Sequence, residues 1–188
     1  MKYQPVRNDS PAMIADLFVR TFSASEGDTE GQVIGQLVNE LLGNALPSNA
    51  LPSNAPTADL TGFVVNDQNT LVGAVLFTRM RFNDHSTVFL LSPMAIHPDY
   101  QRQGLGQALI RHGVNYLQQD GVDMVVTYGA PAFYSKVGFE HITTEQVKPP
   151  YPLSQPEGWQ ALALCARDIL PLQGVALCAS AFDRPELW

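Results

Sequence analysis

Hydrophobic positions are densest at residues 87–96, a run that ends in Met-Ala-Ile. The run is rich in β-branched and aromatic residues and is apolar on both faces, so it predicts a central strand that is buried on both sides. Pro93 interrupts the run, and proline cannot donate a hydrogen bond to a sheet ladder. We therefore expect a bulge at Pro93, or a place where this strand separates from a neighbour.

A glycine-containing turn follows this strand at residues 101–106 and leads into a helical pattern. The side chains that recur at helical spacing are Leu105, Ala108, Leu109, His112, Tyr116 and Leu117. The first turn of a helix leaves backbone N–H groups unpaired and carries about half a positive charge, so this arrangement favours phosphate binding. Gly104 and Gly106 would let the backbone approach a phosphate closely.

The residues before the central strand predict two helices and a hairpin. We expect a strand at residues 3–7, a helix that Ser10 caps and Pro11 begins, a second helix at residues 29–42 that Gly43 ends, and paired strands at residues 60–65 and 70–81. The helical side chains expected to face inward are Met13, Ile14, Leu17, Phe18, Phe22, Val33, Ile34, Leu37, Val38 and Leu41. The sequence Ala-Leu-Pro-Ser-Asn then occurs twice in tandem, which predicts a flexible insert at residues 44–58.

After the long helix, the pattern predicts short strands at residues 124–128, 139–142, 159–164 and 175–179, and a brief helix at residues 131–137. Strands in series, one strand-helix-strand crossover and two early helices predict a mixed α/β fold with helices on both faces of the sheet. A chain of 188 residues with 45% hydrophobic content suits one domain, residues 1–188.

Composition and charge exclude several classes of function. No apolar run is long enough to span a bilayer and the N-terminus lacks signal-peptide features, so we expect a cytoplasmic protein without membrane contact. Cys165 and Cys178 have no metal-type spacing, and we interpret both as small buried hydrophobic residues and expect no bound metal. A net charge of −7 argues against nucleic-acid partners, which require basic surface.

Three classes of phosphate-containing ligand are bound by a glycine turn at the start of a helix, and each class has its own sequence requirements. A P-loop requires Gly-Lys followed by Ser or Thr, which this sequence lacks. A dinucleotide fingerprint requires glycine or alanine where Leu109 stands. The third class is acetyl-coenzyme A.

The acetyl-coenzyme A alternative rests on a resemblance carried by two motifs. Gln101, Gly104 and Gly106 occupy the defining positions of a signature that resembles that of the GCN5-related N-acetyltransferases (GNAT). Downstream, residues 133–139, Phe-Tyr-Ser-Lys-Val-Gly-Phe, are similar to the Tyr-x-x-x-Gly-Phe element of this family. Residues 125–140 are similar to the YhbS-like branch, which usually has an acidic or amide residue where this chain has Ala130.

The resemblance implies an acyl-CoA N-acyltransferase fold: a mixed, mostly antiparallel sheet with a splayed central strand pair and helices on both faces. It also implies acetyl-CoA as the acetyl donor. The backbone of Met94, Ala95 and Ile96 would pair with the pantetheine arm. The pyrophosphate would lie over the turn, and the further coenzyme-binding residues would be Gln101, Arg102, Gln103, Gly104, Leu105, Gly106, Gln107, Phe133 and Lys136.

Acyl transfer to an amine requires a base and an acid. A lysine-like ammonium group has a pKa of about 10.4, so at neutral pH about one molecule in a thousand is ready to attack. The resemblance implies that Tyr134 protonates the departing thiolate and that a backbone amide near Ala95 polarises the thioester carbonyl. Because Lys and Arg are absent between Arg20 and Arg79, we interpret the acidic N-terminal region as the amine side of the site, with Glu26 and Glu30 as bases. Solvated helix-start charges are the alternative for these two residues.

Two functions remain open from the sequence. In the first, the chain is an N-acetyltransferase that acts through a ternary complex on a small cationic amine or a peptide amine, as a monomer or a homodimer. In the second, it is a non-catalytic acetyl-CoA-binding sensor or regulatory module. Tyr134 favours the first.

Overall fold

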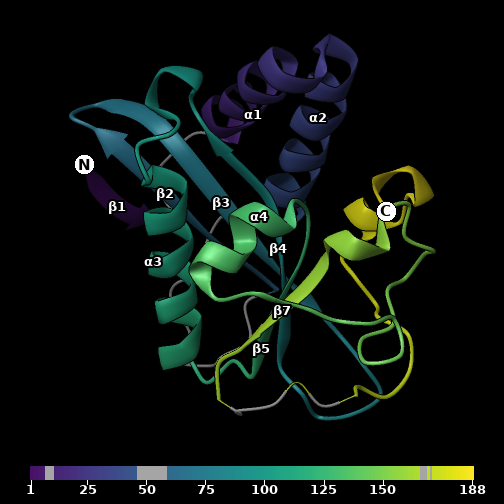
Figure 1. The fold of residues 1–188 in the computed structure, drawn as a ribbon. Coiled ribbons are helices and arrows are strands. Elements are labelled where there is room, and N and C mark those ends of the chain that lie inside the picture. Colours follow the sequence, from purple (N-terminus) through teal and green to yellow (C-terminus); the bar gives the residue numbers. More distant parts are fainter. Residues whose placement is uncertain (7–10, 46–58, 166–168, 170) are drawn as a thin grey trace. The chain divides into compact units, whose positions relative to one another are not determined.

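A computed structural model describes residues 1–6, 11–45, 59–165, 169 and 171–188 (Figure 1). The helices are α1 (Pro11–Glu26), α2 (Asp28–Ala45), α3 (Leu105–Gln119) and α4 (Pro131–Tyr134). The strands are β1 (Lys2–Pro5), β2 (Leu60–Asp67), β3 (Thr70–Met80), β4 (Val88–Ile96), β5 (Met124–Tyr128), β6 (Glu140–His141) and β7 (Trp159–Ala163). Short 3-10 turns include Pro98–Tyr100 before α3 and Ser135–Val137 after α4.

The strands form a seven-stranded sheet in the order β1-β2-β3-β4-β5-β7-β6. β4 and β5 are parallel, whereas β1–β2, β5–β7 and β6–β7 are antiparallel. The predicted mixed, mostly antiparallel α/β class is confirmed. β4 is the predicted central strand, and seven of its nine residues are buried.

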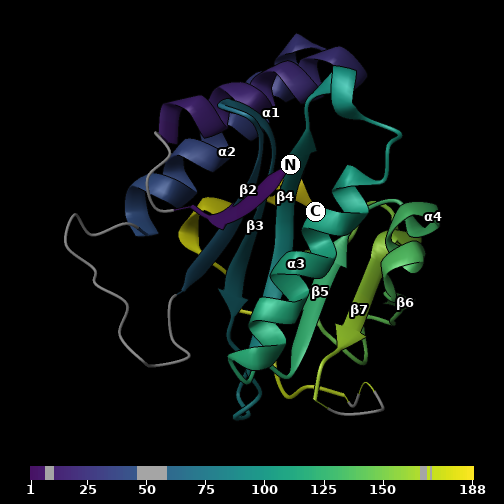
Figure 2. The same cartoon turned by 90° about the vertical axis from the view of Figure 1, so that its left-hand side faces the viewer.

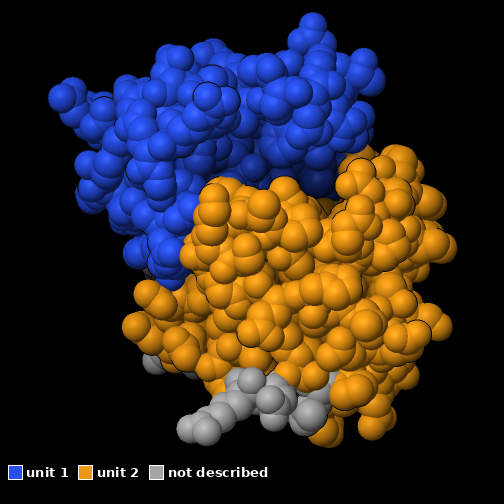
Figure 3. Space-filling view, viewed as in Figure 1, with its two compact units in different colours: residues 1–76, 93–113 blue, residues 77–92, 114–188 orange. Residues whose placement is uncertain are grey.

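One compact unit comprises Met1–Leu76 and Pro93–Gly113 (Figure 3, blue). Within it, α1 and α2 form a hairpin on one face of the strands, and α3 begins on the other face (Figure 2). The hairpin is tight because a Cβ on Gly35 would lie 2.3 Å from a methyl group of Val19. On the α3 side, the ring of His112 stacks on Tyr3 at 5.4 Å and meets the edge of Phe63 at 5.0 Å.

The second unit comprises Phe77–Ser92 and Val114–Trp188 (Figure 3, orange). Its sheet is centred on β5, which pairs with β4 on one side and β7 on the other. Trp159 is fully buried, and its indole N–H donates to the Val147 carbonyl at 2.8 Å. The ring of Trp188 meets that of Trp159 edge to face at 6.0 Å, so the end of the chain packs on the core of this unit.

Most predicted elements are present, and the differences have physical causes. The prediction that Gly43 ends the second helix was wrong: α2 continues to Ala45, because an interior glycine costs only about 1 kcal/mol in a helix. The strand predicted at residues 175–179 is also absent, and this segment makes two isolated bridges, Arg81↔Leu177 and Lys148↔Val175. Leu177 is 67% exposed, so no buried face holds these residues in a ladder.

The predicted inward residues of the helices are mostly buried. Ile14, Leu17 and Phe18 are at most 4% exposed, but Met13 is 56% exposed and was wrongly placed in the core. The Ser10 cap, Arg7 and residues 46–58 of the predicted insert lie outside the described residues. In the part of the chain that is described, no helix has both the length and the hydrophobicity needed to cross a bilayer.

The two cysteines differ in environment, and neither forms a disulfide. Cys178 is half-buried, and burial raises the pKa of its thiol to about 12. Cys165 is exposed, so its predicted burial was wrong, and its thiol donates to the Val122 carbonyl at 3.2 Å.

Candidate functional site

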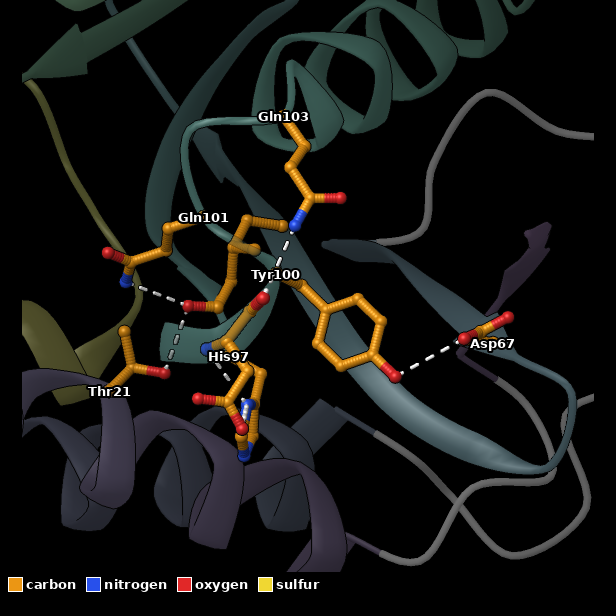
Figure 4. Close-up of polar contacts among 8 residues, drawn as sticks. Thr21, Asp67, His97, Tyr100, Gln101 and Gln103 are labelled. Atoms are coloured by element: carbon orange, nitrogen blue, oxygen red, sulfur yellow. Dashed lines mark hydrogen bonds and ion pairs between the residues drawn. The ribbon is translucent and has the colours of Figure 1, made fainter.

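The chain leaves β4 through a short turn that local hydrogen bonds hold in place (Figure 4). His97 caps the 3-10 turn because its Nδ1 accepts from the Asp99 N–H at 3.4 Å. The Tyr100 hydroxyl donates to Asp67 Oδ2 at 3.2 Å, which ties the turn to the end of β2. This hydrogen bond raises the pKa of Tyr100, because it stabilises the protonated phenol. The entry to α3 is therefore anchored to the sheet.

Gln101 turns its side chain back to the strand that precedes it. Its Nε2 donates to the Ile96 carbonyl at 3.0 Å, and the Thr21 hydroxyl of α1 donates to the same oxygen at 3.4 Å. Figure 4 shows both side chains converging on that oxygen. The last carbonyl of β4 is thus held by side chains from two different elements.

The backbone between Gln101 and α3 is left-handed at two positions. Arg102 has φ = 60° and Gly104 has φ = 78°. A Cβ at position 104 would meet nothing within 4 Å, so glycine is favoured there by its backbone angle and not by lack of space. A left-handed conformation is strained for a residue that carries a Cβ, as Arg102 does, and such residues cluster at functional sites, although Gln68 in the β2–β3 turn shares it at φ = 52°.

The first turn of α3 has the geometry of an anion site. The N–H of Ala108 donates to the Gly104 carbonyl at 3.0 Å, which opens the hydrogen-bond ladder of the helix. The N–H groups of Leu105, Gly106 and Gln107 come before this first bond and point along the helix axis toward the turn. Residues 101–104 are exposed, whereas the Leu105 side chain is 8% exposed and seats the helix start. An anion could reach this turn from solvent.

The residues predicted to bind coenzyme lie on two units. Met94, Ala95, Ile96 and all of residues 101–107 lie on the first unit, on β4 and the turn that follows it. The register of β4 with β5 runs from Val88↔Met124 to Leu91↔Thr127 and so ends two residues before Pro93. β5 itself ends at Tyr128, one residue after the last pair, so a separation of the strands at Pro93 stays a prediction. Phe133 and Lys136 lie on the second unit, in and after α4.

Tyr134 is held on the second unit by aromatic contacts and by a close backbone approach. Its ring meets Phe133 and Phe139 edge to face, at 5.1 and 5.6 Å. The Cα of Gly129 leaves room for the ring, since a Cβ there would lie 2.7 Å from Cε2 of Tyr134. Burial raises the pKa of Tyr134, and a hydrogen bond with Thr127 partly offsets this rise. The phenol is therefore protonated at neutral pH and suited to act as an acid.

Glu26 and Glu30 lie close to each other at the junction of α1 and α2, on the first unit. Burial raises the pKa of Glu26, and the negative charge of Glu30 raises it further. The Glu26 side chain is still exposed, so it can take up or release a proton to solvent. Among the residues that the structure describes, no three His, Cys, Asp or Glu side chains form a group that could hold a metal.

Three residues of these sites were not found from the sequence. The first is Thr21, which donates to the Ile96 carbonyl at the end of β4. The other two lie beside Tyr134: Thr127 shares a hydrogen bond with it, and Gly129 leaves room for its ring. Thr21 and Thr127 could have been found as polar residues inside otherwise apolar patterns, at 7% and 0% exposure. A hollow of about 880 Å³ lies along α2 beside Gln32, Gln36 and Asn39, and its lining does not include the turn before α3.

Comparison with known families identifies one domain. Residues 58–141 match the family model described as an acetyltransferase (GNAT) domain. The uncharacterized N-acetyltransferase YjhQ of Escherichia coli is 34% identical over 114 residues, which cover 57% of this chain and 62% of YjhQ. The uncharacterized N-acetyltransferase YhbS of E. coli is 33% identical over 76 residues, which cover 40% of this chain and 46% of YhbS. The chain thus spans less than two thirds of these curated relatives.

Two solved structures share the fold over nearly the whole chain. The crystal structure of E. coli YhbS in complex with CoA superposes with a TM-score of 0.78 at 23% identity, and covers 97% of this chain and 92% of YhbS. A GNAT family acetyltransferase from Brucella melitensis in complex with acetyl-CoA gives a TM-score of 0.71 at 22% identity, with 97% of each chain covered.

Proposed function

We propose that this chain, which belongs to the GNAT acetyltransferase family through residues 58–141, transfers an acetyl group from acetyl-CoA directly to a primary amine. The observation that carries the proposal is the left-handed turn at Arg102 and Gly104, which leads into α3, whose first N–H groups precede the hydrogen-bond ladder of the helix. The relatives named N-acetyltransferases and the neighbours crystallised with CoA or acetyl-CoA support it.

In this proposal the diphosphate of the coenzyme is bound by backbone N–H groups of residues 103–107. Backbone donors at a helix start suit an anion, because the helix dipole adds a partial positive charge. The guanidinium of Arg102 adds a full positive charge at the same turn. The side-chain amide of Gln103 already donates to the Asp99 carbonyl at 3.3 Å, so Gln103 would contribute its backbone N–H. Met94, Ala95 and the backbone N–H of Ile96 would be available to the pantetheine arm, since the Ile96 carbonyl already accepts from Thr21 and Gln101. Phe133 and Lys136 would add contacts from α4 and its following turn.

The proposed chemistry is one acyl transfer in a ternary complex. The neutral amine attacks the thioester carbon, an amide bond forms and the carbon–sulfur bond breaks. The proton lost from the amine goes to Glu26 or Glu30, and the thiolate takes a proton from Tyr134. The carboxylates suit a base because the raised pKa of Glu26 strengthens it, and the phenol suits an acid because its raised pKa keeps it protonated.

The proposed acceptor is a small cationic amine or a peptide amine. Residues 21–78 carry six carboxylates and no Lys or Arg, so this region would attract a cation. The cytoplasmic location, the single-domain organisation and the monomeric or homodimeric state remain predictions.

The test is release of coenzyme A thiol from acetyl-CoA across a panel of polyamines, aminoglycosides and peptide N-termini. We expect amine-dependent release by the wild type and a loss of at least about tenfold in kcat for Tyr134→Phe, with coenzyme A affinity retained. Tyr116→Phe on α3, which is 40% exposed, is the matched control and should retain full kcat. Coenzyme binding without turnover on any amine would contradict the proposal and favour the non-catalytic sensor.

A further inference from the structure

The carbonyl oxygen of Ile96 accepts hydrogen bonds from two side chains that are far apart in the sequence. Thr21 reaches it from α1 at 3.4 Å, and Gln101 reaches it from the turn before α3 at 3.0 Å (Figure 4). A carbonyl oxygen has two lone pairs, so these donors occupy both. The bond from Thr21 spans 75 positions of sequence, so it is a tertiary contact and not a local cap.

The geometry of Thr21 is unusual for a hydroxyl in the middle of a helix. Such a hydroxyl commonly bonds to a carbonyl of the preceding turn of its own helix. Ser25, one turn later in α1, does this and donates to the Thr21 carbonyl at 3.2 Å. Thr21 instead donates outward to β4. Its side chain and Ile96 are only 7% and 6% exposed, so water cannot readily replace the bond.

We propose that Thr21 is a positioning residue for coenzyme binding, and that it acts together with Gln101 through the Ile96 carbonyl. The inference rests on the proposed function. The peptide group that follows Ile96 sets the direction in which the chain leaves β4 toward the left-handed turn at Arg102 and Gly104. Two donors from different elements fix the orientation of that peptide group, and with it the N–H groups that open α3.

The same bond links α1 to the turn. The end of α1 carries Glu26, whereas the turn carries the proposed diphosphate site. A shift of α1 at Thr21 would therefore shift the backbone of the turn before α3. Binding of the amine near the end of α1 and binding of coenzyme A at the turn would then be coupled through the Ile96 carbonyl oxygen.

A double-mutant cycle on coenzyme A affinity, measured by calorimetry, tests this inference. Thr21→Val removes the hydroxyl with little change of shape, and Gln101→Met removes the amide donor. We expect each single variant to weaken binding by roughly two- to tenfold, in line with the loss of one hydrogen bond. The double variant should lose clearly less than the product of the two single effects, because both donors act on the same oxygen.

Two comparisons separate positioning from a purely structural role. Thr21→Ser and Thr21→Ala both lose the methyl group, and only the serine keeps the hydroxyl, so Ser should bind coenzyme A several-fold more tightly than Ala. This pair also decides the matter if the valine variant does not fold. Ser25→Ala removes a hydroxyl from the same helix without affecting Ile96, and it should bind as the wild type does.

The inference is overturned if Thr21→Val binds coenzyme A as tightly as the wild type, or if Thr21→Ala binds it as tightly as Thr21→Ser. It is also overturned if the loss of affinity in the double variant equals the product of the losses in the two single variants. The proposed function still stands in these cases if the wild type binds coenzyme A and acetylates an amine. A wild type that does not bind coenzyme A would overturn both.

Discussion

A Cβ on Gly129 would lie 2.7 Å from Cε2 of Tyr134, so the ring of Tyr134 rests where any other residue would place its side chain. Gly129 follows β5 directly, and its carbonyl accepts from Gln160 Nε2 at 3.2 Å, which fixes this backbone. The position of the proposed acid is therefore set by the absence of one carbon atom.

Gly129→Ala should displace the ring of Tyr134 and lower kcat by at least about tenfold, while coenzyme A affinity changes little, because the ring would have to shift by several tenths of an ångström. Steady-state kinetics with calorimetric affinity would measure this. Gly43→Ala, where a Cβ meets nothing within 4 Å, is the control. Unchanged kcat in Gly129→Ala would show that the ring position does not matter for turnover.

Thr127→Val should move the basic limb of the pH–rate profile to higher pH. The acid must be protonated, and burial raises the pKa of Tyr134, so the basic limb in the wild type should lie at higher pH than the ionisation of a free tyrosine. The hydrogen bond with Thr127 lowers this pKa, so its removal should raise it further. The position of the limb, and not the maximal rate, is the measured quantity, and a shift to lower pH would contradict the assignment.

Glu30→Gln should lower the pKa of Glu26, because it removes the negative charge that disfavours the ionised form. A base must be ionised, so the acidic limb of the pH–rate profile should move to lower pH if Glu26 is that base. Titration of the Glu26 carboxyl carbon by NMR gives the pKa directly. Asp28→Asn removes a charge from the same first helical turn and is the control. An acidic limb that stays in place while the pKa falls would exclude Glu26.

Arg102→Gly should have opposite effects on folding and on binding. Glycine relieves the left-handed conformation at φ = 60°, so the free energy of unfolding should stay the same or rise by up to about 1 kcal/mol. Loss of the guanidinium should weaken coenzyme A binding a few-fold, less so at high salt. Arg102→Lys is the control, because it keeps both the positive charge and the strained left-handed backbone. Denaturant unfolding and calorimetry measure the two effects, and unaltered affinity at low salt would remove Arg102 from the site.

The sequence was sufficient to predict the elements whose hydrophobic pattern is long and regular. β4, β5 and α3 stand where the pattern placed them, because alternation and helical spacing report burial directly. The strand predicted at residues 175–179 failed because β propensity says nothing about partners, and this segment finds only isolated ones.

The site residues that belong to a sequence motif could be predicted. Those whose role depends on a contact between distant parts of the chain could not. Gly104 was found because it occupies a signature position and would let the backbone approach a phosphate closely, whereas its left-handed φ of 78° was not predicted. The left-handed Arg102 could not be found, since no residue type signals it. Thr21 could have been noticed as a polar residue in an apolar pattern, but the sequence does not show that its partner is Ile96. Both depend on where the end of β4 lies in the folded chain.

The decisive measurement is a crystal structure of the chain with coenzyme A bound. We expect diphosphate oxygens within about 3 Å of the backbone nitrogens of residues 103–107. A diphosphate bound elsewhere on the chain, with this turn empty, would contradict it.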